Sequence, residues 1–150
     1  MQNLLIIEDN LIYSHFLVNS ICKELNNIRL YSIVDTGKKA LEILKKEKID
    51  IIILDLKLPD ISGIDIINYI EGNNLSQYYA SIIVLTNEID LLNQVINKKS
   101  VFTYSSKIDN INSFIDKVRE LSKEKQDISL KNSIKEKISS ESVSYTHLTL

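Results

Sequence analysis

Carboxylate, hydroxyl and ammonium side chains follow four separate apolar runs of this sequence. They are Glu8 and Asp9 after Leu4–Ile7, Asp55 after Ile51–Leu54, Thr86 after Ile82–Leu85, and Lys107 shortly after Val101–Ser105. Short, continuous apolar runs are typical of strands buried on both faces of a parallel sheet. The carboxyl ends of parallel strands lie at one edge, where open α/β sheets bind their ligands. We therefore expect these side chains to meet in one crevice.

Three carboxylates in one crevice predict a divalent cation. Close carboxylates repel one another and raise at least one pKa, and Mg²⁺, which prefers oxygen ligands, removes that repulsion. We expect Asp9 and Asp55 to bind Mg²⁺ directly. Glu8 would reach the ion through a water molecule, and the main-chain carbonyl of Lys57 would be a further ligand.

Asp55 is the expected nucleophile of this site. A carboxylate that keeps one oxygen free can attack phosphorus in line and form an acyl phosphate. The Lys107 ammonium and the Thr86 hydroxyl would neutralise or hydrogen-bond the transferred group. Each residue alone has a plainer role as a helix cap, turn residue or solvent-facing side chain. Their joint placement on different strand ends favours phosphoryl chemistry.

The elements that must position these residues alternate along the chain. Apolar runs predict strands at 4–7, 28–34, 51–55, 81–86 and 101–105. Helical spacing predicts five helices: one at 11–25, one that begins after a cap at Asp35 or Thr36, one at 64–71, one at 89–97 and one from about 109. The strand at 28–34 alternates more than the others, as a strand near a sheet edge does. Successive strand–helix units predict parallel βαβ crossovers, and hence an α/β, doubly wound five-stranded parallel sheet. A barrel would need eight units.

Composition places the chain among ordinary globular proteins. Its 150 residues carry a net charge of −2 and are 44% hydrophobic, which excludes a basic, nucleic-acid-binding body. The single cysteine, Cys22, excludes an internal disulfide, fits a reducing compartment and is expected to pack within a helix. No apolar run reaches the roughly 18 residues of a membrane span, and the N-terminus lacks the features of a secretory signal. We therefore expect a cytoplasmic protein with no membrane partner.

The motifs around these residues carry a family resemblance. They are Leu5-Ile6-Ile7-Glu8-Asp9-Asn10, Ile53-Leu54-Asp55 with Pro59 and Gly63, Leu85-Thr86, and Tyr104 placed three residues before Lys107. From Asn3 to Leu121 the chain resembles the receiver domain of a two-component response regulator. The resemblance implies a flavodoxin-like three-layer sandwich with strand order 2-1-3-4-5, and a signalling domain that is not an enzyme.

The resemblance also implies a switch controlled by phosphorylation. Asp55 would take its phosphoryl group from a histidine kinase or phosphotransfer protein, with Glu8 and Asp9 helping to hold Mg²⁺. Thr86 and Tyr104 would form the switch: the Thr86 hydroxyl turns toward the phosphate and the Tyr104 ring follows it inward. That movement repacks the face of the fourth helix, fifth strand and fifth helix. The output implied is transcription, with nucleic acid bound only through a further domain.

Composition changes beyond Leu121. We interpret residues 1–121 as the receiver domain, 122–143 as a helical extension or a linker to a missing output domain, and 144–150 as a non-native tail. Leu91, Phe114 and Leu121 are candidates for an apolar surface used in a phosphorylation-dependent homodimer, with core packing as the alternative for each.

Three departures from the family pattern carry predictions of their own. Ile108 follows Lys107 where the family has proline, so we predict a trans bond between them and some displacement of the lysine. Lys98-Lys99-Ser100 replace a small pair, so the helix before them is expected to end differently. Asn87 follows Thr86 where a small residue is usual, which would narrow access to the phosphate.

Lys57 and Glu88 lie two residues beyond Asp55 and Thr86. We predict that they pair across the mouth of the site and slow the loss of phosphate, because the pair would impede an attacking water.

Other functions leave different signatures. An aspartyl-phosphate hydrolase of the haloacid-dehalogenase type carries a second Asp two residues after its nucleophile, and this chain has Lys57 there. A flavin-binding domain needs glycine and hydroxyl clusters around its phosphate, and the chain has only Gly37, Gly63 and Gly72. The open alternative is a pseudo-receiver, an interaction module that works without phosphorylation.

Overall fold

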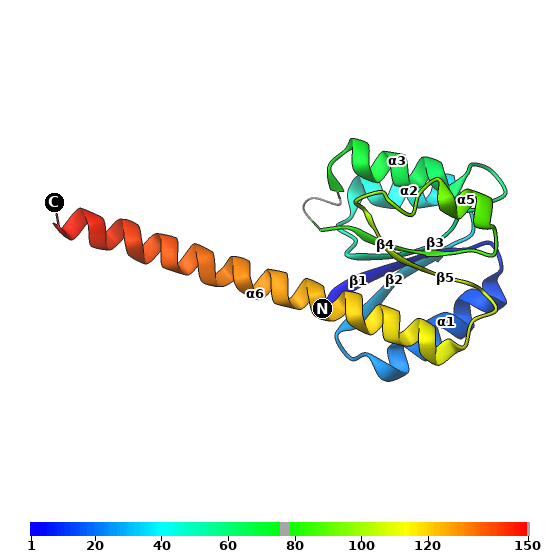
Figure 1. The fold of residues 1–150 in the computed structure, drawn as a ribbon, viewed down its shortest axis with the longest axis horizontal. Helices are drawn as coiled ribbons and strands as arrows, with labels where there is room; N and C mark the ends of the chain where they lie inside the picture. The colour runs from blue at the N-terminus through cyan, green and yellow to red at the C-terminus, as the bar shows by residue number, and fades with distance from the viewer. Residues whose placement is uncertain (76–78, 150) are drawn as a thin grey trace.

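Strands and helices alternate along the whole chain (Figure 1). The computed structural model describes the backbone of residues 1–75 and 79–149 and the side chains of these residues up to 139. The strands are β1 (Gln2–Ile7), β2 (Ile28–Val34), β3 (Ile51–Asp55), β4 (Ser81–Leu85) and β5 (Val101–Ser105). The helices are α1 (Leu11–Glu24), α2 (Gly37–Lys46), α3 (Gly63–Gly72), α5 (Ile89–Asn93) and α6 (Ile111–Thr149).

All five strands are parallel and lie in the order β2-β1-β3-β4-β5, which confirms the predicted doubly wound sheet. The strand at 28–34 is an edge strand, as its alternating pattern indicated. In the central pairs Ile6 lies opposite Ile53, and Ile53 lies opposite Ile83. This register brings the carboxyl ends of β1, β3 and β4 level with one another.

Helices cover both faces of the sheet and make two apolar cores (Figure 1). Successive residues of β3 point to opposite faces, so Ile52 and Leu54 pack under α2, α3 and α5, while Ile51 and Ile53 pack against α1 and α6. Every residue of β3 is buried. The result is the three-layer sandwich that the sequence predicted.

Side-chain caps define where the helices begin. The Asn10 side chain accepts a hydrogen bond from the Tyr13 amide at the start of α1, and Thr36, one of the two predicted caps, does the same at α2. Asp60, in the β3–α3 loop, accepts hydrogen bonds from the amides of Gly37 and Lys38 at 2.8 and 2.9 Å. These bonds fasten the loop that follows Asp55 to the first turn of α2.

The α5 helix is shorter than the predicted span 89–97. After Asn93 the amides of Gln94 and Val95 bond carbonyls three residues back, at 3.1 and 3.0 Å, so the chain tightens into turns. The turns keep Val95 fully buried in the core.

One further expectation about packing is wrong. Cys22 is exposed, because α1 turns Ser14, Leu17 and Ile21 toward the core instead. For Phe114 and Leu121, core packing, the alternative left open by the sequence, holds: both are buried. Leu91 is partly buried against the core.

The last helix, α6, is the longest element of the chain. Its first part packs beside α1, and its last part extends away from the sheet (Figure 1). Ser122 and Lys125 hold α6 to the rest of the domain. The Ser122 carbonyl accepts a hydrogen bond from Gln2 at 3.0 Å and its hydroxyl accepts one from Asn27 at 2.6 Å, while Lys125 donates to the Tyr79 carbonyl. Helix continues through 122–149, and residue 150 lies outside the described residues. No helix among the described residues combines the length and apolar character needed to cross a membrane.

Candidate functional site

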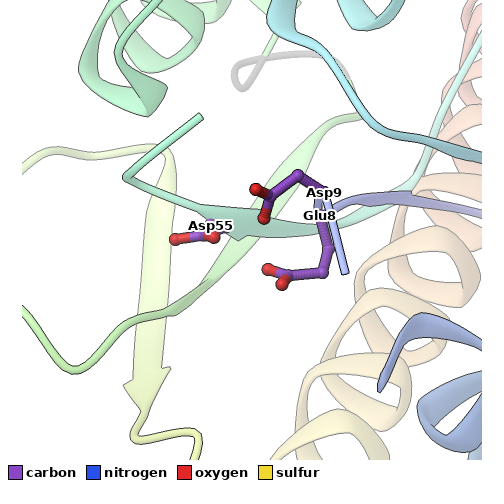
Figure 2. A group of neighbouring side chains, drawn as sticks. All are labelled: Glu8, Asp9 and Asp55. Atoms are coloured by element: carbon purple, nitrogen blue, oxygen red, sulfur yellow. The ribbon is translucent and has the colours of Figure 1, made fainter. Parts of the chain in front are cut away.

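The carboxylates predicted from the strand ends come together at the edge of the sheet (Figure 2). Asp55 is the last residue of β3, and Glu8 and Asp9 directly follow β1. One carboxylate oxygen from each lies within 4.8 Å of the others. Glu8 and Asp55 are only 1% and 4% exposed, whereas Asp9 is exposed. The chain therefore places two buried acids and one solvent-facing acid around a single point.

Lys107 forms ion pairs with both buried acids. Its Nζ lies 2.9 Å from Asp55 Oδ2 and 2.9 Å from Glu8 Oε1. Its ammonium also lies 5.9 Å from the centre of the Tyr13 ring, within the range of a cation–π contact. No peptide bond among the described residues is cis, so the 107–108 bond is trans as predicted. Lys107 nevertheless reaches Asp55, and the replacement of proline by Ile108 does not displace the ammonium from the site.

The loop after β3 shapes the other side of Asp55. The Lys57 amide donates a hydrogen bond to Asp55 Oδ1 at 3.0 Å, so each carboxylate oxygen has one partner. The Gly63 amide bonds the Leu56 carbonyl at 2.9 Å, which brings the start of α3 against the end of the strand. A Cβ on Gly63 would lie 2.6 Å from the Asp55 carbonyl oxygen. Glycine is required there by this close approach of two backbones.

The two expected switch residues differ in their surroundings: Thr86 lines the cleft that opens onto Asp55, whereas Tyr104 is exposed on β5. Thr86, buried directly after β4, accepts a hydrogen bond on Oγ1 from the Glu88 amide at 2.9 Å. Tyr104 on β5 is 44% exposed. Lys117 of α6 lies 5.5 Å from the centre of its ring and donates to its carbonyl at 2.8 Å.

Burial dominates the electrostatics of the acids. Burial and the neighbouring Asp55 carboxylate raise the pKa of Glu8 from 4.5 to about 7, against the opposing effect of Lys107. Burial would lower the pKa of Lys107, but its hydrogen bonds to Glu8 and Asp55 outweigh that effect and raise it. Glu8 therefore changes charge near neutral pH.

The residues present fit a hard divalent cation. Glu8 Oε2 is buried and finds no hydrogen-bond partner among the described residues, which is costly unless a donor or a cation satisfies it. The donor set consists of carboxylate oxygens, the ligands that Mg²⁺ prefers. Lys57 lies beside Asp55, where its main-chain carbonyl was predicted as a further ligand.

A cleft of about 340 Å³ opens onto Asp55. It is lined by Asp9, Asp55, Lys57, Leu58, Pro59, Thr86, Asn87, Glu88 and Lys107. Lys57 and Glu88 approach to 3.9 Å at its rim, so the predicted pair across the mouth is present. Asn87 lines the cleft, but its Oδ1 is engaged by the β5–α6 loop, accepting from Ser106 Oγ at 2.8 Å and from the Lys107 amide at 3.0 Å.

Sequence reasoning missed Tyr13 and Ser106 as members of the site. Tyr13 lies in the first turn of the helix predicted to begin at Leu11, and the first turn of that helix directly follows the strand end with Glu8 and Asp9. No local signal in the sequence indicates that Ser106 bonds Asn87.

The match to known proteins agrees with this geometry. Residues 4–122 match the response regulator receiver domain family, and the chain belongs to that family. It is thus a signalling domain of two-component systems and not a classical enzyme. No curated protein matches it in sequence.

Solved structures repeat the fold. The signal receiver domain of a LuxO repressor protein from Vibrio parahaemolyticus superposes with a TM-score of 0.75 at 26% identity, over 86% of this chain and 95% of that one. A CheY-like receiver domain from Methanospirillum hungatei gives 0.72 at 18% identity, over 85% and 98%. The response regulator TrrA from Thermotoga maritima, crystallised with Mg²⁺ and BeF, gives 0.68 at 23% identity, over 81% and 99%.

Proposed function

We propose that this receiver domain is a switch in which Asp55 accepts a phosphoryl group from a histidine kinase or phosphotransfer protein. The observation that carries the proposal is a buried carboxylate with Lys107 Nζ 2.9 Å away, two further acids beside it, and an open cleft in front of it. This is the arrangement that an acyl phosphate needs, because the nucleophile, the charge that balances the product and the entry path are all in place.

The transfer uses the groups of this chain as follows. An Asp55 oxygen forms a bond to phosphorus while the phosphorus–nitrogen bond to the donor histidine breaks. The imidazole keeps the electron pair of that bond and takes up a proton from water. Lys107 remains beside Asp55 and neutralises one oxygen of the transferred phosphoryl group. The Thr86 hydroxyl turns from the Glu88 amide and donates a hydrogen bond to a second oxygen of that group.

Glu8, Asp9, Asp55 and the main-chain carbonyl of Lys57 are the groups we propose for Mg²⁺. When bound, Mg²⁺ neutralises the carboxylates and the oxygens of the phosphoryl group. The partnerless Glu8 Oε2 and the approach of three acids to within 4.8 Å support this assignment. So does the Thermotoga maritima relative, which was crystallised with Mg²⁺ and BeF.

Conformational changes of Thr86 and Tyr104 transmit phosphorylation of Asp55 to the surface of the domain. When Thr86 turns toward the phosphate, the space it vacates admits the Tyr104 ring, which must first leave Lys117. The face that changes is made by α5, β5 and α6. We propose that it controls an output, transcription being the function expected, either through a homodimer or through a domain reached by α6.

We propose the following division of the chain. Residues 1–121 are the receiver domain, 122–143 are a helical link toward an output domain, and 144–150 are a non-native tail. Four apolar side chains of the extension are about half exposed or more: Ile128, Leu130, Ile134 and Ile138. Such side chains suit a segment that packs on another domain.

Exposed apolar side chains flank the phosphorylation site and support a protein partner. Ile12 at the start of α1 and Ile108 beside Lys107 are 86% and 87% exposed, and Leu11 and Phe16 of α1 are about half exposed. We propose that they dock a histidine kinase or phosphotransfer protein in the cytoplasm.

Labelling tests the function directly. The purified chain is incubated with acetyl phosphate or a phosphorylated kinase, with and without Mg²⁺, beside an Asp55→Asn variant. We expect stoichiometric, Mg²⁺-dependent labelling of the parent and none of the variant. An unlabelled parent, or equal labelling of the two, would contradict the proposal, and an unlabelled parent would favour the pseudo-receiver.

A further inference from the structure

The loop between β5 and α6 carries Lys107 between a buried residue, Ser105, and an exposed one. Ile108, the residue after the lysine, is 87% exposed. Within the loop, Asp109 Oδ2 accepts from the Ser106 amide at 3.0 Å, and the Asp109 amide donates to the Ser106 carbonyl at 3.1 Å. These bonds give the loop its local shape. The Ser105 carbonyl accepts a hydrogen bond from the Thr86 amide at 3.1 Å, which fixes the chain to the sheet two residues before Lys107 but leaves Lys107 itself to be positioned.

Asn87 supplies the missing tie. Its Oδ1 accepts two hydrogen bonds from the loop, one from Ser106 Oγ at 2.8 Å and one from the Lys107 amide at 3.0 Å. In the described part of the chain, the second is the one hydrogen bond that joins the backbone of Lys107 to another element. The Lys107 side chain extends from this anchored amide to both buried acids at 2.9 Å.

We propose, on the basis of the phosphoacceptor function proposed above for Asp55, that Asn87 is a positioning residue for Lys107. A lysine has four rotatable side-chain bonds, so a small rotation of its backbone moves the ammonium by more than the tolerance of a hydrogen bond. Asn87 prevents that rotation. Asn87 directly follows Thr86, so a movement of the β4–α5 loop at Thr86 also moves the β5–α6 loop, which Asn87 bonds and which carries Lys107.

A role for Asn87 in narrowing the cleft predicts the opposite change in the phosphorylation rate from a role in positioning Lys107. If Asn87 only narrowed the cleft, its truncation would admit the phosphodonor more easily and phosphorylation would become faster. If Asn87 positions Lys107, truncation leaves the lysine mobile and phosphorylation becomes slower. Loss of two hydrogen bonds at this partly solvated place corresponds to about a tenfold slower rate.

The test is a double-mutant cycle on phosphorylation by acetyl phosphate at saturating Mg²⁺. The rates of the parent, Asn87→Ala, Lys107→Ala and the double variant are followed on phosphate-affinity gels, and thermal unfolding checks that each variant is folded. We expect Asn87→Ala to be about tenfold slower than the parent and the double variant to match Lys107→Ala within about twofold, because Asn87 acts through the lysine. An unchanged or faster Asn87→Ala, or losses that multiply in the double variant, would overturn the proposal.

Two further variants sharpen the result. Ser106→Ala removes one of the two bonds and should give an intermediate loss. Asn97→Ala truncates an exposed asparagine in the segment before β5 and should keep the parent rate.

Amide hydrogen exchange at Lys107 needs no phosphorylation and separates the two proposals. We expect Asn87→Ala to speed the exchange of this amide about tenfold, because its acceptor is gone. Faster exchange together with an unlabelled parent would refute the phosphoacceptor function and keep the anchoring contact. Unchanged exchange would refute the anchor even if the parent is labelled.

Discussion

Replacing Glu8 by Gln is predicted to stabilise the metal-free protein, and to do so mainly above neutral pH. In the unfolded chain Glu8 ionises near 4.5, whereas in the folded protein burial first, and the Asp55 carboxylate second, raise its pKa to about 7. A group whose pKa is raised by folding contributes stability below its unfolded pKa and loses it as pH rises through the folded value. The parent should therefore lose stability between about pH 4.5 and 7.

The size of the effect follows from the two pKa values. Each pH unit between them corresponds to about 1.4 kcal/mol, so full ionisation costs about 3 kcal/mol. Glu8 is 1% exposed, so solvent does not screen this cost appreciably. Because part of the cost is already present at pH 5, the gain from Glu8→Gln should grow by about 2 kcal/mol between pH 5 and pH 8.

Urea denaturation in a chelator at the two pH values measures this change. Glu42→Gln on α2 is a matched control that removes an exposed carboxylate, and it should change the free energy of unfolding by less than about 0.5 kcal/mol at either pH. A Glu8→Gln effect that is the same at pH 5 and pH 8 would refute the reasoning, because it would mean that Glu8 titrates alike in the folded and unfolded chains.

Three other predictions concern the metal, the backbone at Gly63 and the rim of the cleft. Mg²⁺ at ten times its dissociation constant should raise the free energy of unfolding, measured by calorimetry at pH 8, by about 1.4 kcal/mol. The effect should be smaller at pH 5, where Glu8 is protonated. Equal stabilisation at both pH values, or an undiminished stabilisation of Asp9→Asn, would argue against the acid cluster as the Mg²⁺ site. Gly63→Ala should lower the free energy of unfolding in urea by more than about 2 kcal/mol, because the new Cβ would lie 2.6 and 2.7 Å from backbone atoms. Gly72→Ala, whose Cβ would have nothing within 4 Å, should leave the free energy of unfolding unchanged. Similar losses for the two variants would contradict the steric account. Glu88→Ala should speed dephosphorylation by no more than about fivefold, because the 3.9 Å pair with Lys57 is exposed, and equal rates would remove its role in shielding the phosphate.

Much of the fold follows from local patterns. The β3 strand is a run of large apolar residues, and a run of that kind is stable only when both of its faces are covered. The capping residues Asn10 and Thr36 act within one helical turn, so their roles are also readable from neighbouring residues. The acids directly follow apolar runs, so the amino-acid sequence alone assigns them to the carboxyl-terminal edge of a parallel sheet.

An error arose where a helix face had to be chosen. Cys22 lies on a row with Ser14 and Val18; Ser14 is buried and Val18 is packed against the core, but Cys22 at the end of the row is exposed. Phe114, a candidate for a free surface or for the core, is buried, because the start of α6 fills the core beside β5. Periodicity identifies an amphipathic helix, whereas packing decides which residues at the border of the apolar face are covered.

The class of fold, the strands that carry the acids and the chemistry those acids suit can be read from the amino-acid sequence, because each depends on residues close together in the chain. The contact of Lys107 with Glu8, 99 residues away, and the bond from the Lys107 backbone to Asn87, 20 residues away, appear once the chain is folded. The same holds for the burial that makes Glu8 titrate near neutral pH. Distances between side chains on different strands, and the exclusion of water from between them, depend on how the two layers of helices pack over the sheet.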